Sequence, residues 1–352
     1  MQKVDAQILK ILSESKKSIW ELLDAFDFNL RELICGLRRL HDAGLIFVDE
    51  EGFALTERGK NTLDPNIATF KPVKCGECFG RRFLLAGRFK EIFEEFKEIT
   101  KTRPQPTFDY FQGYMDEIDV ISRVAFMHYY NDLYDKDILL VGDDDLLSVA
   151  LSLTYMPSKI CVLDIDERIG NYLSQVNKEH GFDIEFRKYN VAEPLPDDLI
   201  HKFDVFSSEP LETVSGLKAF IGRGVSCLKA NGVGYFGLTV AEASHEKWLK
   251  IEKLLANGNC VITDIIRGFS RYPMKYGDVN YETFVAKLKV PVKENPGIHW
   301  YKSALIRFEI LGEPKHIIDP KRRLKVEFVD KADDITHISV NQCGENGGEI
   351  KE

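Results

Sequence analysis

The sequence lacks long hydrophobic runs. No stretch of about 18 apolar residues occurs in the 352-residue chain, so no membrane-spanning helix is expected. The first 17 residues, MQKVDAQILKILSESKK, include Asp5 and Glu14 and have no uninterrupted apolar core. They do not resemble a secretory signal, and we therefore expect a cytoplasmic protein.

An excess of positive charge is also missing. The chain has 47 Lys and Arg residues against 56 Asp and Glu residues, a formal net charge of −9. General binding to nucleic-acid phosphates needs a basic surface, so nucleic acid is not an expected partner. The acidic balance is instead compatible with cationic ligands.

The first 65 residues show a helical pattern followed by a hairpin pattern. Apolar residues recur at helical spacing in three successive segments, and Gly44 marks the end of the third. The sequence LIFVDEEGFALT then places two apolar runs around a turn at Gly52. This order predicts a winged-helix domain over 1–65.

A winged helix commonly reads DNA through its third helix. Here the tip of the wing carries Asp49, Glu50 and Glu51, where phosphate contact would favour basic residues. The alternative is a dimerisation or packing module. We expect no DNA contact and a homodimeric assembly.

The rest of the chain alternates strand and helix patterns. Residues 66–102 are interpreted as a connector and a helix, and 103–315 as a Rossmann-like catalytic domain. Strands alternating with helices predict an α/β domain with a doubly wound, mostly parallel sheet of the class I methyltransferase-like type. Residues 316–352 are expected to form a C-terminal extension and a mobile tail.

Acidic and polar residues follow the first four predicted strands of this sheet. Ligands of such sheets bind outside the carboxyl ends of the strands, so these residues are the candidate site. They are Gly142, Asp143, Asp144, Asp145, Asp164, Asp166, Asn190, Glu209 and Glu212.

Two of the strand ends suit a nucleoside. A carboxylate accepts two hydroxyl hydrogen bonds, so Asp164 or Asp166 is predicted to hold a ribose diol, although either acid could instead cap the next helix. Asn190 could read an adenine edge, and asparagine also fits a turn.

A glycine-rich phosphate loop is absent after the first strand. Gly142 is followed by Asp143, Asp144 and Asp145, and carboxylates there would repel phosphate and the carboxylate of S-adenosylmethionine. Like charges about 4 Å apart cost about 4 kcal/mol at an effective dielectric of about 20. Decarboxylated S-adenosylmethionine, which is cationic, fits better. The alternative is an acidic helix N-terminus.

The second acidic cluster, Glu209 and Glu212, completes a pocket suited to a polycation. The predicted chemistry is attack of an amine on the methylene beside a sulfonium. Because such amines are mostly protonated at neutral pH, a carboxylate must orient the amine and take its proton. Asp144 and Glu209, with Asp143, are the predicted catalytic residues.

Several segments together resemble the branched-chain polyamine synthases of thermophiles. They are VGDDDLLS, DIDERI, SEPLET, GRGVSCLK, GYFGLT and ITDIIRGF, and the resemblance covers about 70–310. It implies transfer of aminopropyl groups from decarboxylated S-adenosylmethionine to the internal amine of spermidine. No prosthetic group is implied.

The resemblance also implies residue roles. It places Asp143, Asp144 and Asp145 at the aminopropyl and amine site, Asp164 or Asp166 at the ribose, and Glu209 where the family tends to have an aspartate in an Asp-Pro-Pro segment. Gly142 and Asp145 are expected to bind the donor. Tyr110, Gln112 and Tyr114 resemble an aromatic substrate loop, the alternative being packing against the sheet edge. Glu212 is expected to contact the polyamine.

Two other functions remain open from the sequence. An S-adenosylmethionine-dependent methyltransferase would use the same fold, and a polyamine-sensing regulator would bind without turnover. No metal site is expected, because Cys75 and Cys78 supply two ligands where a structural zinc site needs four.

Overall fold

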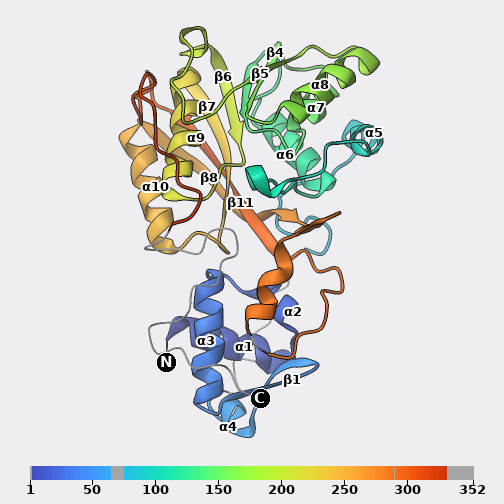
Figure 1. Ribbon diagram of the computed structural model, residues 1–352, viewed down its shortest axis with the longest axis vertical. Helices are drawn as coiled ribbons and strands as arrows, with labels where there is room; N and C mark the ends of the chain where they lie inside the picture. The colour runs from blue at the N-terminus through green and yellow to red at the C-terminus, as the bar shows by residue number, and fades with distance from the viewer. Residues whose placement is uncertain (1, 65–74, 289, 331–352) are drawn as a thin grey trace.

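The computed structural model describes residues 2–64, 75–288 and 290–330. Figure 1 shows a small helical unit at one end, drawn in blue, and a larger α/β unit. The small unit contains its elements in the predicted order, followed by a short helix that the pattern did not indicate. They are α1 (Lys3–Glu14), α2 (Ile19–Ala25), α3 (Leu30–Asp42), β1 (Ile46–Asp49), β2 (Gly52–Leu55) and α4 (Glu57–Lys60).

Local signals set the ends of these helices. Ser18 with Glu21, and Asn29 with Glu32, form capping boxes that begin α2 and α3. Gly44 has a φ of +66°, and its N–H donates to the carbonyl of His41, as expected for a glycine that ends a helix.

The large unit is built on a seven-stranded sheet in the order β5-β4-β3-β6-β7-β11-β8. The first five of these strands are parallel, and β11 runs antiparallel to both of its neighbours, β7 and β8. This confirms the predicted α/β, mostly parallel sheet. The strands are β3 (Asp137–Val141), β4 (Lys159–Asp164), β5 (Ile184–Lys188), β6 (Phe203–Ser208), β7 (Leu228–Thr239), β8 (Cys260–Tyr272) and β11 (Tyr301–Ile310).

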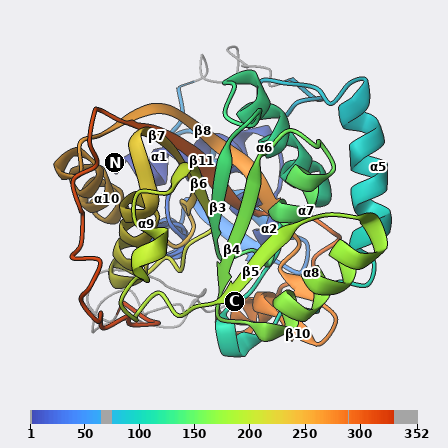
Figure 2. The ribbon, with the colours of Figure 1, turned by 90° about the horizontal axis from the view of Figure 1, so that it is seen from above.

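Helices cover both faces of the sheet, as Figure 2 shows. Ile138 and Leu140 of β3 belong to one apolar cluster, whereas Leu139 and Val141 belong to the other, because successive strand residues face opposite sides. One face is covered by α9 (Val214–Cys227) and α10 (His245–Asn257), and the other by α6 (Glu117–Tyr129), α7 (Leu147–Ser152) and α8 (Glu167–His180), with α5 (Arg88–Thr100) outside them.

After β11 the chain returns to the loop that follows β5. Residues 316–330 lie in the predicted extension, where Pro320 accepts a hydrogen bond from Leu195 N (2.7 Å) and Leu324 N donates to the carbonyl of Ala192 (2.8 Å). The predicted tail over 331–352 lies outside the described residues. The short elements are η2 (Phe108–Tyr110), η3 (Asp197–Leu199), β9 (Lys275–Tyr276), β10 (Val279–Asn280) and η4 (Tyr281–Leu288).

None of the described helices combines the length and apolar character needed to cross a membrane.

Candidate active site

A cavity of about 670 Å³ opens at the carboxyl ends of β3, β4, β6 and β7. It lies where parallel α/β sheets bind ligands. Residues 109–113 form one wall, and residues 324–326 together with Phe328, from the C-terminal extension, form another.

The cavity lining is strongly acidic. Among the described residues, six that bear a carboxyl group line the cavity against one basic residue, Lys325, so its electrostatics favour a cationic ligand. The six are Asp109, Asp144, Asp164, Glu209, Glu212 and Glu242.

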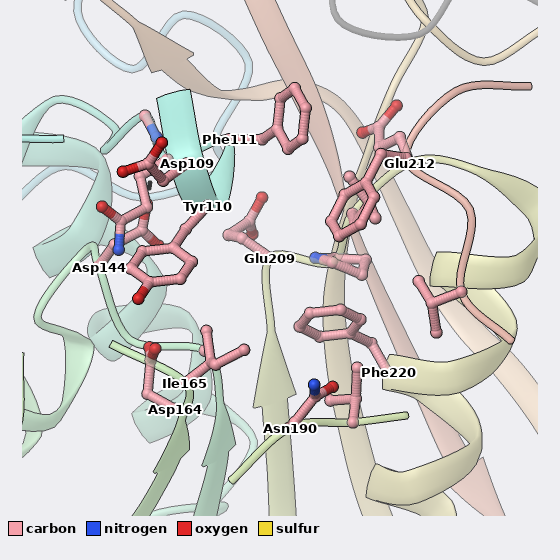
Figure 3. Close-up of a pocket in the computed structure, with 18 of the residues that line it drawn as sticks. Asp109, Tyr110, Phe111, Asp144, Asp164, Ile165, Asn190, Glu209, Glu212 and Phe220 are labelled. Atoms are coloured by element: carbon pink, nitrogen blue, oxygen red, sulfur yellow. Dashed lines mark hydrogen bonds between the residues drawn. The ribbon is translucent and has the colours of Figure 1, made fainter. Parts of the chain in front are cut away.

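Eight of the twelve predicted site residues line this cavity, and four do not. Figure 3 shows Asp144 and Tyr110 on one side and Glu212 on the other, with Glu209 between them. The eight lining residues are Gly142, Asp144, Asp164, Asn190, Glu209, Glu212, Tyr110 and Gln112. The four outside the lining are Asp143, Asp145, Asp166 and Tyr114.

The acidic run after β3 is divided by the turn that follows the strand. Gly142 begins this turn with a φ of +79°, in the left-handed region that glycine adopts more readily than other residues. Asp143 points into the protein, where it accepts hydrogen bonds from the backbone N–H (3.2 Å) and hydroxyl of Ser148. Burial raises the pKa of Asp143 to about 8, so this carboxyl is largely protonated at neutral pH.

Asp145 is also turned away from the cavity. It accepts a hydrogen bond from Met115 N (2.7 Å), and burial raises its pKa well above the ordinary value. Asp144 alone of the three faces the cavity. Repulsion of an anionic ligand at this turn therefore depends on one aspartate, together with Glu209 of the same cavity.

Asp144 retains acceptor capacity toward the cavity. Its Oδ2 accepts a hydrogen bond from Gly113 N (3.1 Å), and Arg103 donates to its backbone carbonyl. Burial raises the pKa of Asp144, although Arg103 lowers it. A carboxylate with a raised pKa is a better proton acceptor than an ordinary aspartate.

The structure separates the two candidate ribose acids. Asp164 lines the cavity, and its two oxygens accept from Asp143 N (2.9 Å) and Asp166 N (2.8 Å), which fixes both turns. Burial raises its pKa to about 6. Asp166 instead caps α8 and contacts Arg168 (2.6 Å) and Gln112 (2.9 Å). Although burial opposes it, these contacts lower the pKa of Asp166.

An apolar slot lies beside Asp164. Figure 3 shows Ile165 and Phe220 near Asn190 at the floor of the cavity. The Oδ1 of Asn190 accepts from Ala192 N (2.9 Å), which is the turn role considered for this residue. Its side chain nevertheless lies at the cavity wall.

Glu209 is held from behind by two donors. Arg123 of α6, whose side chain is 2% exposed, forms an ion pair with Oε1, and the Tyr272 hydroxyl donates to Oε2 (2.6 Å). A side chain at Gly237 would collide with this carboxylate, since its Cβ would lie 1.9 Å from Oε2. Arg123 and Tyr272 therefore fix the carboxyl group of Glu209 at the cavity wall.

Glu212 and Glu242 form a pair of carboxyl groups near the end of β7. Glu212 accepts hydrogen bonds from the backbone N–H (2.6 Å) and hydroxyl (2.5 Å) of Thr239. Burial, followed by the charge of Glu242, raises the pKa of Glu212 to about 8. Burial together with Glu242, to which its hydroxyl is hydrogen-bonded, also raises the pKa of Tyr301 well above its usual range.

Of the predicted aromatic loop, one part faces the cavity and another packs against the protein. Tyr110 lines the cavity. Tyr114 packs under the Arg103 guanidinium (3.8 Å to the ring centre) and against Tyr276 (4.6 Å between ring centres). Phe111 stacks on Phe328 of the C-terminal extension, with 5.4 Å between ring centres.

Sequence reasoning missed five residues of this site. Glu242 follows β7 and could have been found by applying the strand-end rule to a fifth strand. Tyr301 begins an antiparallel strand, and Arg123 lies on a helix, so neither carries a strand-end signal. The five are Arg123, Glu242, Tyr272, Tyr301 and Phe328.

Cys75 and Cys78 are free thiols in a turn near the surface. Across residues 2–64, 75–288 and 290–330, no group of three or more metal-ligating side chains gathers.

Sequence comparison gives one family and several close relatives. The C-terminal domain of branched-chain polyamine synthase A matches residues 91–334. An N(4)-bis(aminopropyl)spermidine synthase of Thermococcus kodakarensis is 37% identical over 310 residues, covering 87% of each chain. One of Methanocaldococcus jannaschii is 38% identical, covering 88% of this chain and 89% of that protein.

A solved structure is similar over nearly the whole chain. It is the branched-chain polyamine synthase of Thermus thermophilus in complex with N4-aminopropylspermidine and 5'-methylthioadenosine. The TM-score is 0.81 at 32% sequence identity, and the match covers 94% of this chain and 93% of that chain.

Proposed function

The chain belongs to the branched-chain polyamine synthase family, and from this membership we propose that it transfers aminopropyl groups to a polyamine. The acceptor is spermidine, attacked at its internal amine to give branched products. The donor is decarboxylated S-adenosylmethionine. The observation that carries this assignment is one acidic cavity that presents Asp144 and Glu209 to the same space.

The nucleoside of the donor fits the floor of the cavity. Asp164, with both oxygens already fixed by backbone donors, has lone pairs left for the ribose hydroxyls. The adenine lies in the slot between Ile165 and Phe220, with Asn190 at its edge. Asp143, Asp145 and Asp166 do not touch the ligand and instead hold the turns that carry Asp144, Asp164 and Gln112.

The reaction is a displacement at carbon. The internal amine of spermidine forms a bond to the aminopropyl methylene as the carbon–sulfur bond breaks. The bonding electron pair goes to sulfur, which neutralises the sulfonium and releases 5'-methylthioadenosine. The proton of the amine goes to Asp144. Holding both substrates in line supplies a large part of the rate.

Asp144 and Glu209 have different tasks in this step. Asp144 has a raised pKa and free acceptor capacity, so it serves as the proton acceptor. Glu209 is anchored by Arg123 and Tyr272, so it orients the amine and stabilises its positive charge. Tyr110, Gln112 and Glu212 contribute to the polyamine wall.

Several features outside the cavity are proposals of the same kind. The three helices and the hairpin within residues 2–64 support the winged-helix domain predicted over 1–65. The strand order of the sheet supports the class I methyltransferase-like type. The homodimer and the cytoplasmic location stay predictions.

The test is calorimetric titration with S-adenosylmethionine and with its decarboxylated form, followed by mass analysis of spermidine after incubation with each. Preferential binding of the decarboxylated form, with a product gaining one or two aminopropyl units, is the expected result. Preference for the carboxylated form with a gain of methyl units would overturn the proposal and establish a methyltransferase. Ligand binding without any change in mass would point to a sensor.

A further inference from the structure

The N-terminal unit is docked onto the cavity wall by the beginning of its third helix. The backbone N–H of Leu30, the first residue of α3, donates to the carbonyl of Ala241 (3.0 Å). Ala241 directly precedes Glu242, which lines the cavity. Phe28 packs edge-on against His245, the first residue of α10, with 5.6 Å between ring centres.

A second set of contacts reaches the other side of this wall. Lys302 donates to the Asp24 carboxylate (2.7 Å), and Trp20 packs on Trp300 (6.4 Å between ring centres). Lys302 and Trp300 flank Tyr301, which lines the cavity and is hydrogen-bonded to Glu242. The unit thus contacts the neighbours of Glu242 and Tyr301 without touching the cavity itself.

The docking contacts lie at the beginning of the helix that would read DNA. In a helix-turn-helix protein the N-terminal residues of the recognition helix contact base edges. Here Asn29 and Leu30, which begin α3, are 7% and 2% exposed. Arg267 of β8 also donates to the carbonyl of Asp27 (3.1 Å), beside this helix end.

We infer that the N-terminal unit is a positioning element for the substrate cavity, which holds Glu242 and Tyr301 in place for one end of the polyamine acceptor. This inference rests on the proposed function for the identity of the ligand. Leu30, Asp24 and Trp20 act through the cavity residues. In Figure 1 the unit lies at the end of the molecule where β11 begins, consistent with this role.

Leu30→Pro tests the central hydrogen bond. Proline suits the first position of a helix, and Asn29, with φ −70° and ψ 161°, already has the conformation favoured before proline. The matched control Leu30→Ala loses similar packing but keeps the N–H. Asp24→Asn weakens the contact to Lys302, and Asp27→Asn, whose carbonyl still accepts from Arg267, is its control.

The full-length chain is assayed for the KM of spermidine, for kcat and for the dissociation constant of 5'-methylthioadenosine. Relative to its control, Leu30→Pro should raise the KM of spermidine about three- to tenfold, the range supported by one hydrogen bond, with little change in nucleoside binding. Asp24→Asn should raise the KM by less, because Lys302 also donates to the backbone carbonyl of Asp24. Folded variants with an unchanged KM for spermidine would overturn the inference. A general loss of structure would instead affect all three quantities.

Hydrogen exchange separates this inference from the proposed function. Amides of residues 239–245 and 300–303 should exchange faster in Leu30→Pro than in Leu30→Ala, whatever the ligand. If wild-type protein transferred no aminopropyl group, the proposed function would fail, and the exchange data would still decide whether the unit holds the wall. Equal exchange in the two variants, or tight binding of DNA fragments by the intact chain at physiological salt, would overturn the inference.

Discussion

Glu209→Gln is the most informative perturbation of the site, because this carboxylate faces both the cavity and a buried guanidinium. The substitution preserves shape and removes one charge. An ammonium about 4 Å from the carboxylate gains about 4 kcal/mol at an effective dielectric of about 20. That is about a thousandfold in kcat/KM, and it is an upper bound because Arg123 opposes part of the attraction. We expect a loss of about 100- to 1000-fold.

The same substitution leaves Arg123 buried without a counter-charge. Its side chain is 2% exposed and its Nε has no hydrogen-bond partner among the described residues. Breaking a buried ion pair costs about 3–5 kcal/mol, so the free energy of unfolding in guanidinium should fall by about this amount. Replacing both residues, as in Arg123→Met with Glu209→Gln, should recover much of this stability and little of the activity.

Both predictions, the loss of kcat/KM and the loss of stability, are tested by steady-state kinetics and guanidinium denaturation. The proteins compared are wild type, Glu209→Gln, the double variant, and Glu98→Gln as the control. Glu98 is an exposed glutamate on α5 that pairs with Lys101 and does not line the cavity. If Glu209→Gln kept near-normal kcat/KM, Glu209 would not be the orienting charge. If the double variant were less stable than the single one, the account of Arg123 would be wrong.

Three further predictions follow from the geometry. Asp144→Asn should lower kcat by about 100-fold or more at unchanged folding, because the proton acceptor is lost; near-normal turnover would assign the base elsewhere. Burial raises the pKa of Asp143 to about 8, above its value in the unfolded chain, so the folded protein holds a proton that the unfolded chain releases. Stability should therefore fall as pH rises from about 5 to 7, and Asp143→Asn should reduce that slope by about 1.4 kcal/mol per pH unit in denaturation curves. Phe220→Ala should weaken 5'-methylthioadenosine binding in calorimetry by about tenfold through loss of apolar contact, and equal affinity would place the adenine outside the slot.

The order of elements could be predicted from the sequence because each depends on local pattern. Apolar spacing marked α1, α2 and α3, and buried runs ending in acids marked β3 and β4. The strand-end rule then brought Asp144, Asp164, Asn190 and Glu209 to one edge of the sheet, where the structure places them around one cavity.

Two features of the site could not be predicted from local sequence pattern. One is the direction in which each side chain points, and the other is the set of site residues that come from distant parts of the chain. Asp143, Asp144 and Asp145 are equivalent in sequence, but a turn that begins with a positive φ at Gly142 directs only Asp144 into the cavity. Tyr301 reaches the site because β11 runs antiparallel, so its first residue lies at the edge where the parallel strands end.

What the sequence determined by itself was therefore the order of the main helices and strands and the acidic character of the site, since both follow from residue type and spacing along the chain. The tertiary structure decided which carboxyl groups carry charge toward a ligand. Arg123 lies 86 residues before Glu209, and Ala241 lies 211 residues after Leu30. Contacts over such separations depend on how the whole chain packs, and packing is what sets burial, pKa and the orientation of each side chain.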